Sequence, residues 1–93
     1  MSQKKSFFTI VIPVYNKAPH IRRAINSVLN QTFQDFELIL INDASTDNSL
    51  EEMQKFTDLR IRILHRDEPG PGGYAARNLG IREASSEWVS FLD

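Results

Sequence analysis

Residues 36–49, FELILINDASTDNS, constrain the fold more than any other part of the chain. They open on the nearly unbroken apolar run 38–41, which is too short for a buried helix and rich in β-branched residues. Such a run predicts a strand that is buried on both faces, as in a parallel sheet.

The residues after this run indicate a loop and then a helix. Positions 42–48 carry no large apolar side chain, and Leu50, Met53 and Phe56 share one helical face. Asp43 is therefore expected at the carboxyl end of a buried strand, the edge at which open α/β sheets bind ligands. The alternative is that Asp43 is only a capping or turn residue.

The same alternation of strand and helix runs through the whole chain. Strands are predicted over residues 7–14, 38–41, 61–65 and 88–92, and helices over residues 17–29, 46–56 and 74–84. We expect Pro13 to mark the end of the first strand and Asn16 to cap the first helix, and we expect the third strand nearer the sheet edge. The order βαβαβαβ predicts an α/β fold with a Rossmann-like, doubly wound, mostly parallel sheet.

Size and composition narrow the class of protein. The 93 residues suit one small domain, and the absence of cysteine excludes disulfides and thiolate metal sites. A net charge of −1 with scattered basic residues gives no support for nucleic-acid binding. The apolar runs are too short to span a membrane and no signal peptide is evident, which favours a cytoplasmic protein. Since the chain stops directly after a strand, we interpret residues 1–93 as a single partial domain, truncated after Asp93.

Four polar clusters follow the predicted strands or open the helices: residues 13–16, 42–47 and 68–77, and Asp93. A doubly wound sheet brings them to one edge. Tyr15 is suited to stack on a planar base, or else packs against the first helix. Arg77 is suited to a diphosphate, or else is a surface arginine paired with Glu83. Asp93 is suited to Mg²⁺, Mn²⁺ or a ribose hydroxyl, or else is incidental.

The glycine-rich segment 70–75, GPGGYA, matches the dinucleotide fingerprint G-x-G-x-x-G/A. That fingerprint belongs between the first strand and the first helix, whereas here it follows the third strand. The position argues against a nicotinamide cofactor and favours a flexible loop or lid over a ligand.

Five ordered motifs resemble the inverting family-2 glycosyltransferases of the GT-A fold. They are TIVIPVYN at 9–16, SVLNQTF at 27–33, FELILINDASTD at 36–47, ARNLG at 76–80 and WVSFLD at 88–93. The resemblance therefore covers nearly the whole chain and implies the amino-terminal, nucleotide-sugar-binding half of the GT-A fold.

The resemblance also implies roles for single residues. Tyr15 and Asp43 match the positions that hold the base of the donor, and Pro13 and Asn16 match positions that shape that pocket. Arg77 matches the arginine near the donor diphosphate. Asp93 matches the first aspartate of the family's Asp-x-Asp motif, which binds ribose and, with its successor, Mg²⁺ or Mn²⁺.

There are two departures from the family pattern. Asn42-Asp43-Ala44 stands where Asp-Asp-Gly is frequent, and Lys17 and Ala18 stand where an acidic residue is frequent. The first departure keeps the aspartate that matches the base-binding position.

The function implied is a hexosyltransferase-like transfer of sugar, with inversion, from a nucleotide donor, expected to be a UDP-sugar. The acceptor would be a hydroxyl of a sugar, lipid-linked or glycan substrate in cell-envelope polysaccharide or glycan synthesis. We expect the parent protein in the cytoplasm, with peripheral association at the cytoplasmic face of the membrane left open. The catalytic base would lie beyond Asp93, so we expect the 93-residue chain alone to be inactive. The alternatives are a non-catalytic nucleotide-binding module and an α/β scaffold without a ligand.

Overall fold

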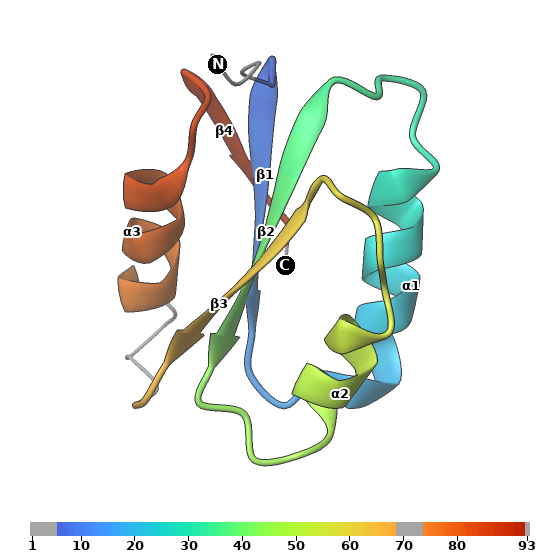
Figure 1. The fold of residues 1–93 in the computed structure, drawn as a ribbon. Helices are drawn as coiled ribbons and strands as arrows, with labels where there is room; N and C mark the ends of the chain where they lie inside the picture. The colour runs from blue at the N-terminus through green and yellow to red at the C-terminus, as the bar shows by residue number, and fades with distance from the viewer. Residues whose placement is uncertain (1–5, 69–73, 93) are drawn as a thin grey trace.

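A computed structural model describes residues 6–68 and 74–92. The strands and helices alternate along the whole chain, as Figure 1 shows. In chain order they are β1 (Phe8–Val14), α1 (Ala18–Leu29), β2 (Phe36–Asp43), α2 (Ser49–Gln54), β3 (Ile61–Arg66), α3 (Tyr74–Glu83) and β4 (Trp88–Phe91). The predicted βαβαβαβ order is confirmed.

The four strands form one parallel sheet in the order β3-β2-β1-β4. The central strand β2 is buried along its whole length, which explains its continuous apolar run. β3 mixes half-buried and exposed residues and lies at an edge of the sheet, as predicted. The sheet is therefore the doubly wound arrangement that the sequence pattern indicated.

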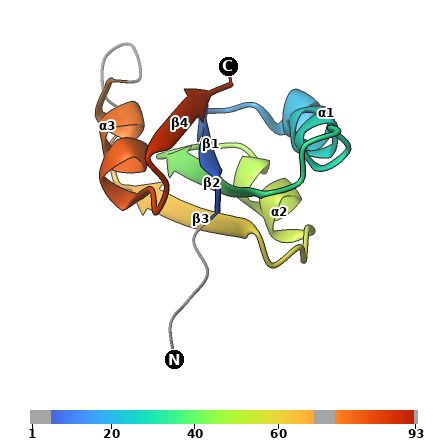
Figure 2. The ribbon, with the colours of Figure 1, turned by 90° about the horizontal axis from the view of Figure 1, so that it is seen from above.

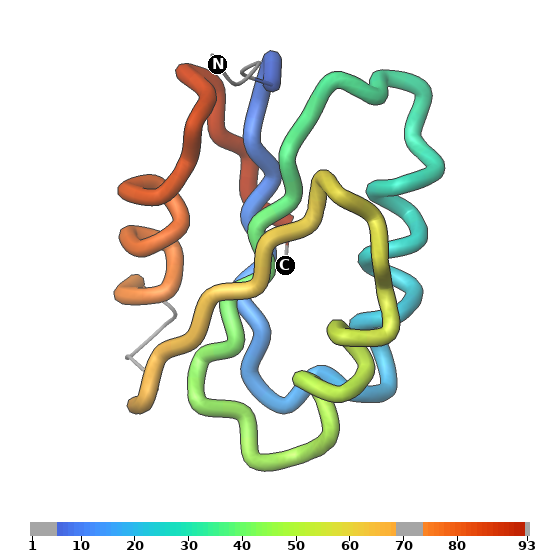
Figure 3. The backbone as a smooth tube through the Cα atoms, viewed as in Figure 1, coloured from blue at the N-terminus to red at the C-terminus, as the bar shows by residue number. Residues whose placement is uncertain are grey.

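Helices cover both faces of the sheet. α1 and α2 lie on one face and α3 lies on the other, as the view from above in Figure 2 and the tube in Figure 3 show. The larger core, on the α1 and α2 side, includes Ile10, Ile12, Ile25, Leu38 and Leu40. The smaller core, beneath α3, consists of Val11, Ile39, Ile41 and Ala76. Alternate residues of β1 and β2 thus feed the two cores.

Two local predictions differ from the structure. β1 continues through Pro13 to Val14, although proline was expected to end the strand. Val11 accepts a hydrogen bond on the β4 side, from Leu92, so the missing N–H of Pro13 falls on that same side. The ladder with β4 has already ended at Phe91, so Pro13 interrupts no ladder on that side. The ladder with β2, on the other side, does not use the N–H group of residue 13.

The second difference is the length of α2, which spans Ser49–Gln54 and not residues 46–56. The backbone N–H groups of Thr46 and Asp47 donate to the side chain of Asn16 in the neighbouring loop. These residues are held by tertiary hydrogen bonds, and the helix begins only after them.

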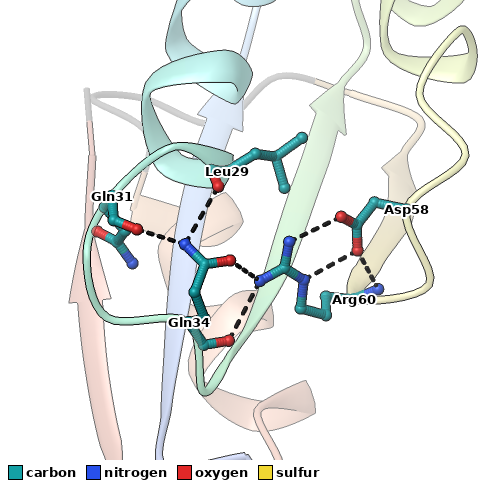
Figure 4. A network of polar contacts seen from close by, with 5 residues as sticks. All are labelled: Leu29, Gln31, Gln34, Asp58 and Arg60. Carbon is teal, nitrogen blue, oxygen red and sulfur yellow. Dashed lines mark hydrogen bonds and ion pairs between the residues drawn. The ribbon is translucent and has the colours of Figure 1, made fainter.

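A hydrogen-bond network closes the amino edge of the sheet, at the end opposite to the polar loops. Figure 4 shows Arg60 donating to Gln34 and to Asp58, while Gln34 donates to the carbonyl of Leu29 at 3.3 Å. The Arg60 guanidinium also lies 4.4 Å from the centre of the Phe36 ring. Hydrogen bonds from Arg60 lower the pKa of Asp58 to about 2.

A buried carboxylate in β2 ties the loop between α3 and β4 to the central strands at the same edge. Glu37 accepts hydrogen bonds from the Thr9 hydroxyl at 2.7 Å and from the Ser85 backbone N–H at 2.6 Å, and Arg62 Nη1 lies 3.7 Å from it. Burial alone would raise the pKa of Glu37. The Ser85 and Thr9 bonds and the Arg62 charge outweigh burial and hold that pKa below its ordinary value of 4.5.

We predict that Glu37→Gln flattens the acid side of the stability profile. Because the folded-state pKa of Glu37 lies below the unfolded one, its contribution is complete above the unfolded pKa and is lost as pH falls from about 5 through the folded pKa. The free energy of unfolding, measured by urea titration at several pH values, should fall less steeply in the variant than in the wild type. The exposed control Glu51→Gln should keep the wild-type slope; equal slopes in all three would contradict the prediction.

α3 approaches the sheet closely through Gly80. A Cβ atom built there would lie 2.5 Å from Cγ1 and 2.9 Å from Cγ2 of Val11, which is fully buried in β1. The buried residues of α3 are the small residues Ala76 and Gly80, which lie on the face that meets the sheet.

We predict that Gly80→Ala destabilises the chain by about 1–3 kcal/mol through overpacking, although alanine favours helix by about 1 kcal/mol. Thermal melting measures the change. The control Asn78→Ala makes a smaller gain in helix propensity at an exposed position of the same helix, and it should leave the stability of the chain unchanged or slightly raised. Val11→Ala combined with Gly80→Ala should lose less than the sum of the two single changes, and strict additivity would refute the contact.

Candidate functional site

The register of the central strands brings two polar loops together. Val14 at the end of β1 pairs with Asn42 near the end of β2, so the loops after these strands begin side by side. In Figure 1 the strands β1, β2 and β3 all end at the bottom of the view, where α3 also begins. This is the ligand-binding edge that the topology predicts.

A pocket of about 260 Å³ opens at this edge. It is lined by Pro13, Val14, Tyr15, Lys17, Asp43 and Arg77. Four of the six residues that the sequence proposed for donor binding (Pro13, Tyr15, Asp43 and Arg77) thus meet in one place, although 64 positions separate Pro13 from Arg77 in the chain (77 − 13).

Asp43 is the buried carboxylate of the pocket, with a side chain that is 5% exposed. Its Oδ1 accepts a hydrogen bond from Nη1 of Arg66, the residue that pairs with it across β2 and β3. A carboxylate offers about four lone-pair sites, so Asp43 can accept bonds beyond the one from Arg66. The sequence analysis missed Arg66; its place at the end of the third predicted strand was the available signal.

Tyr15 and Arg77 flank this carboxylate. Tyr15 is 47% exposed, so it is not a core aromatic. Arg77 is half-buried in the first turn of α3, and Glu83, its alternative partner in the sequence, pairs with Arg62 at 3.1 Å. Lys17, another residue that the sequence analysis did not place in the site, adds a second cationic side chain to the pocket lining.

Asn16 does not line the pocket and does not cap α1 as predicted. Lys17 occupies the N-cap position and makes no side-chain capping bond. The N–H groups at the start of α1 are satisfied by side chains at and just before the start of α2. Asp47 accepts from the N–H of Ala18 at 3.2 Å, and Ser49 accepts from the N–H of Lys17 at 2.9 Å. Asn16 adopts a positive φ of 51° and accepts hydrogen bonds from that same loop.

Ala44 also has a positive φ, of 60°. This is the position at which the resembling family frequently has glycine, the residue that adopts this conformation without strain. Ala44 therefore adopts the left-handed backbone conformation that glycine would adopt without strain at this position.

Asp93 and the glycine-rich segment 70–73 lie outside the described residues, so the predictions that fall on them stay predictions. Within residues 6–68 and 74–92, no three metal-ligating side chains come together. The described part of the pocket, with Asp43 paired to Arg66, therefore does not by itself fit a divalent metal.

Comparison with known proteins decides the family. Residues 9–93 match the family described as Glycosyl transferase family 2. The chain belongs to this family.

Relatives and solved structures agree with the assignment. An uncharacterized glycosyltransferase of Rickettsia bellii is 45% identical over 87 residues, with 91% of this chain and 12% of the relative covered. Glycosyltransferase GlyG of Streptococcus pneumoniae is 38% identical, with 91% and 29% covered. The S. aureus TarS 1-349 structure superposes with a TM-score of 0.87 at 29% identity, covering 94% of this chain and 27% of the TarS 1-349 chain.

A second solved structure is the mannosyltransferase PcManGT from Pyrobaculum calidifontis, in complex with GDP-Man and Mn²⁺. It superposes with a TM-score of 0.82 at 25% identity, covering 92% of this chain and 26% of that protein. The chain spans only 12% of the length of the Rickettsia bellii relative and 34% of the length of an uncharacterized glycosyltransferase of Haemophilus influenzae, to which it is 41% identical. Among the described residues of this family member, no helix is long and apolar enough to cross a bilayer.

We predict that Arg66→Ala destabilises the chain by about 1–3 kcal/mol, because it leaves the buried Asp43 carboxylate without its cation. Urea unfolding measures the change. The control Arg22→Ala removes an ion pair of a side chain that is 61% exposed and should cost less than about 1 kcal/mol. Adding Asp43→Asn to Arg66→Ala should restore part of the loss; a wild-type midpoint for Arg66→Ala alone would contradict the prediction.

Proposed function

We propose that this chain binds the nucleotide-sugar donor of an inverting glycosyltransferase, and that the donor is a UDP-sugar. The observation that carries the proposal is the pocket that gathers Tyr15, Asp43 and Arg77 at the carboxyl edge of the sheet. It is supported by the TarS structure, which was solved in complex with UDP, and by PcManGT in complex with GDP-Man and Mn²⁺.

The base would lie between Tyr15 and Asp43. The exposed Tyr15 ring offers a face for stacking, which contributes about 1–3 kcal/mol per base in nucleic-acid binders. The Asp43 carboxylate only accepts hydrogen bonds, so it favours uracil, whose N3 carries a proton, over cytosine, whose N3 is itself an acceptor. The charge-assisted hydrogen bond from Arg66 holds the Asp43 side chain in place for this contact.

The diphosphate would extend toward Arg77 and Lys17. Both cationic side chains line the pocket, and both would stabilise the charge that develops on the departing diphosphate. The acceptor hydroxyl attacks the anomeric carbon in one displacement, so the new glycosidic bond forms as the bond to the diphosphate breaks, with inversion. A general base outside the described residues takes the hydroxyl proton.

The remaining parts of the proposal concern the whole protein. Mg²⁺ or Mn²⁺, held with the help of Asp93, would supply further charge at the diphosphate. The acceptor would be a sugar, lipid-linked or glycan hydroxyl in cell-envelope polysaccharide or glycan synthesis. We place this chemistry in the cytoplasm.

Asp43→Asn tests the base contact by isothermal titration with UDP and CDP. An asparagine can present an N–H to the cytosine N3, so UDP should bind at least about tenfold more weakly and the preference for UDP over CDP should shrink. The exposed control Asp35→Asn, at the amino edge, should bind both nucleotides like the wild type. A wild-type chain that binds no UDP would overturn the proposed function, and an unchanged UDP preference in Asp43→Asn would overturn the role of Asp43.

A further inference from the structure

One hydroxyl group brackets Tyr15 from both sides. The Ser45 Oγ donates to the carbonyl of Val14 at 3.2 Å and accepts from the backbone N–H of Asn16 at 3.1 Å. The residues directly before and after Tyr15 are thus bonded to the same oxygen atom. This closes a small ring across the backbone from which the Tyr15 side chain projects.

Ser45 is itself fixed to the central strand. Its backbone N–H donates to Oδ1 of Asn42 at 3.2 Å, and Asn42 is only 9% exposed at the end of β2. The turn between them contains Ala44 at its positive φ. The hydrogen bond to Asn42 therefore fixes the Ser45 hydroxyl relative to the end of β2, which also carries Asp43.

Asn16 reinforces the ring from the opposite direction. Its Oδ1 accepts from the backbone N–H groups of Thr46 at 2.8 Å and of Asp47 at 3.2 Å. The loop after β1 thus binds the loop after β2 through the Asn16 side chain, and the loop after β2 binds the loop after β1 through the Ser45 side chain.

These hydrogen bonds matter for Tyr15 because packing against the core does little to fix its side chain. Its side chain is 47% exposed, so the core does not fix the ring. A stacking ring that must be ordered on ligand binding loses affinity, whereas a backbone fixed in advance avoids part of that cost.

We propose that Ser45 is a positioning residue that presents Tyr15 to the base of the nucleotide donor. The inference rests on the proposed donor binding and adds a residue that acts through Tyr15 without contacting the base. If Ser45 only stabilised the fold, Ser45→Ala would weaken UDP binding equally whether position 15 carried tyrosine or alanine. If Ser45 positions Tyr15, Ser45→Ala weakens binding only when the tyrosine is present.

Ser45→Ala removes both bonds and should weaken UDP binding by about fivefold to tenfold in isothermal titration. Ser45→Thr keeps the hydroxyl and should restore affinity. The matched control is Ser85→Ala, which deletes a hydroxyl that donates to Glu37 at 2.7 Å at the opposite edge of the sheet. It should lower the melting temperature without changing UDP affinity.

The deciding measurement is a double-mutant cycle with Tyr15→Ala. If Ser45 acts through Tyr15, then Ser45→Ala has no further effect on UDP affinity once the tyrosine ring is removed. Should Ser45→Ala not fold, Asn16→Gly keeps the positive φ but removes the side chain that binds the backbone of Thr46 and Asp47, which weakens the support of Ser45, and the same cycle with Tyr15→Ala applies.

Additive losses in the cycle would overturn the inference, as would wild-type affinity in Ser45→Ala. In either case the proposed function survives, because the wild-type chain still binds UDP. A wild-type chain without UDP binding removes the proposed function and this inference together.

Discussion

Parallel pairing of β1 with β2 is the constraint on which the rest of this structure depends. The ladder runs from Phe8 with Phe36 to Val14 with Asn42, and both strands are almost entirely buried. Because their register is fixed by two cores on opposite faces, a slip of one residue would turn each apolar set toward the wrong helices. The same register sets the two loops of the site side by side, so packing in the core determines the geometry of the pocket.

The polar networks of Glu37 and Arg60 and the pocket lie at opposite ends of this sheet. At the amino edge, Glu37 and Arg60 tie loops and strands together through hydrogen bonds and ion pairs. At the carboxyl edge, the bonds between loops leave Tyr15 half exposed and keep the pocket open. Asp43 belongs to both kinds of interaction, since it is buried and paired with Arg66 yet lines the pocket.

The fold and much of the pocket could be predicted from the sequence, because both depend on periodicity and topology. The apolar run of β2 and the order of elements were enough to place Tyr15, Asp43 and Arg77 at one edge. Bonds that depend on individual backbone angles and on tertiary register were not predictable in this way. Asn16 was therefore mistaken for a helix cap, and the contacts of Arg66 and Ser45 were missed.

The separation of the two ends has a practical consequence for anyone who handles this protein. The described chain begins at the amino edge, where the Ser6 carbonyl accepts a hydrogen bond from Ser86. The length of β1, about 20 Å at 3.3 Å per residue, separates that edge from the pocket. A surface linker that immobilises the chain at Ser6 would hold it by the edge opposite to Tyr15, which is the orientation that surface-based titrations of the pocket require.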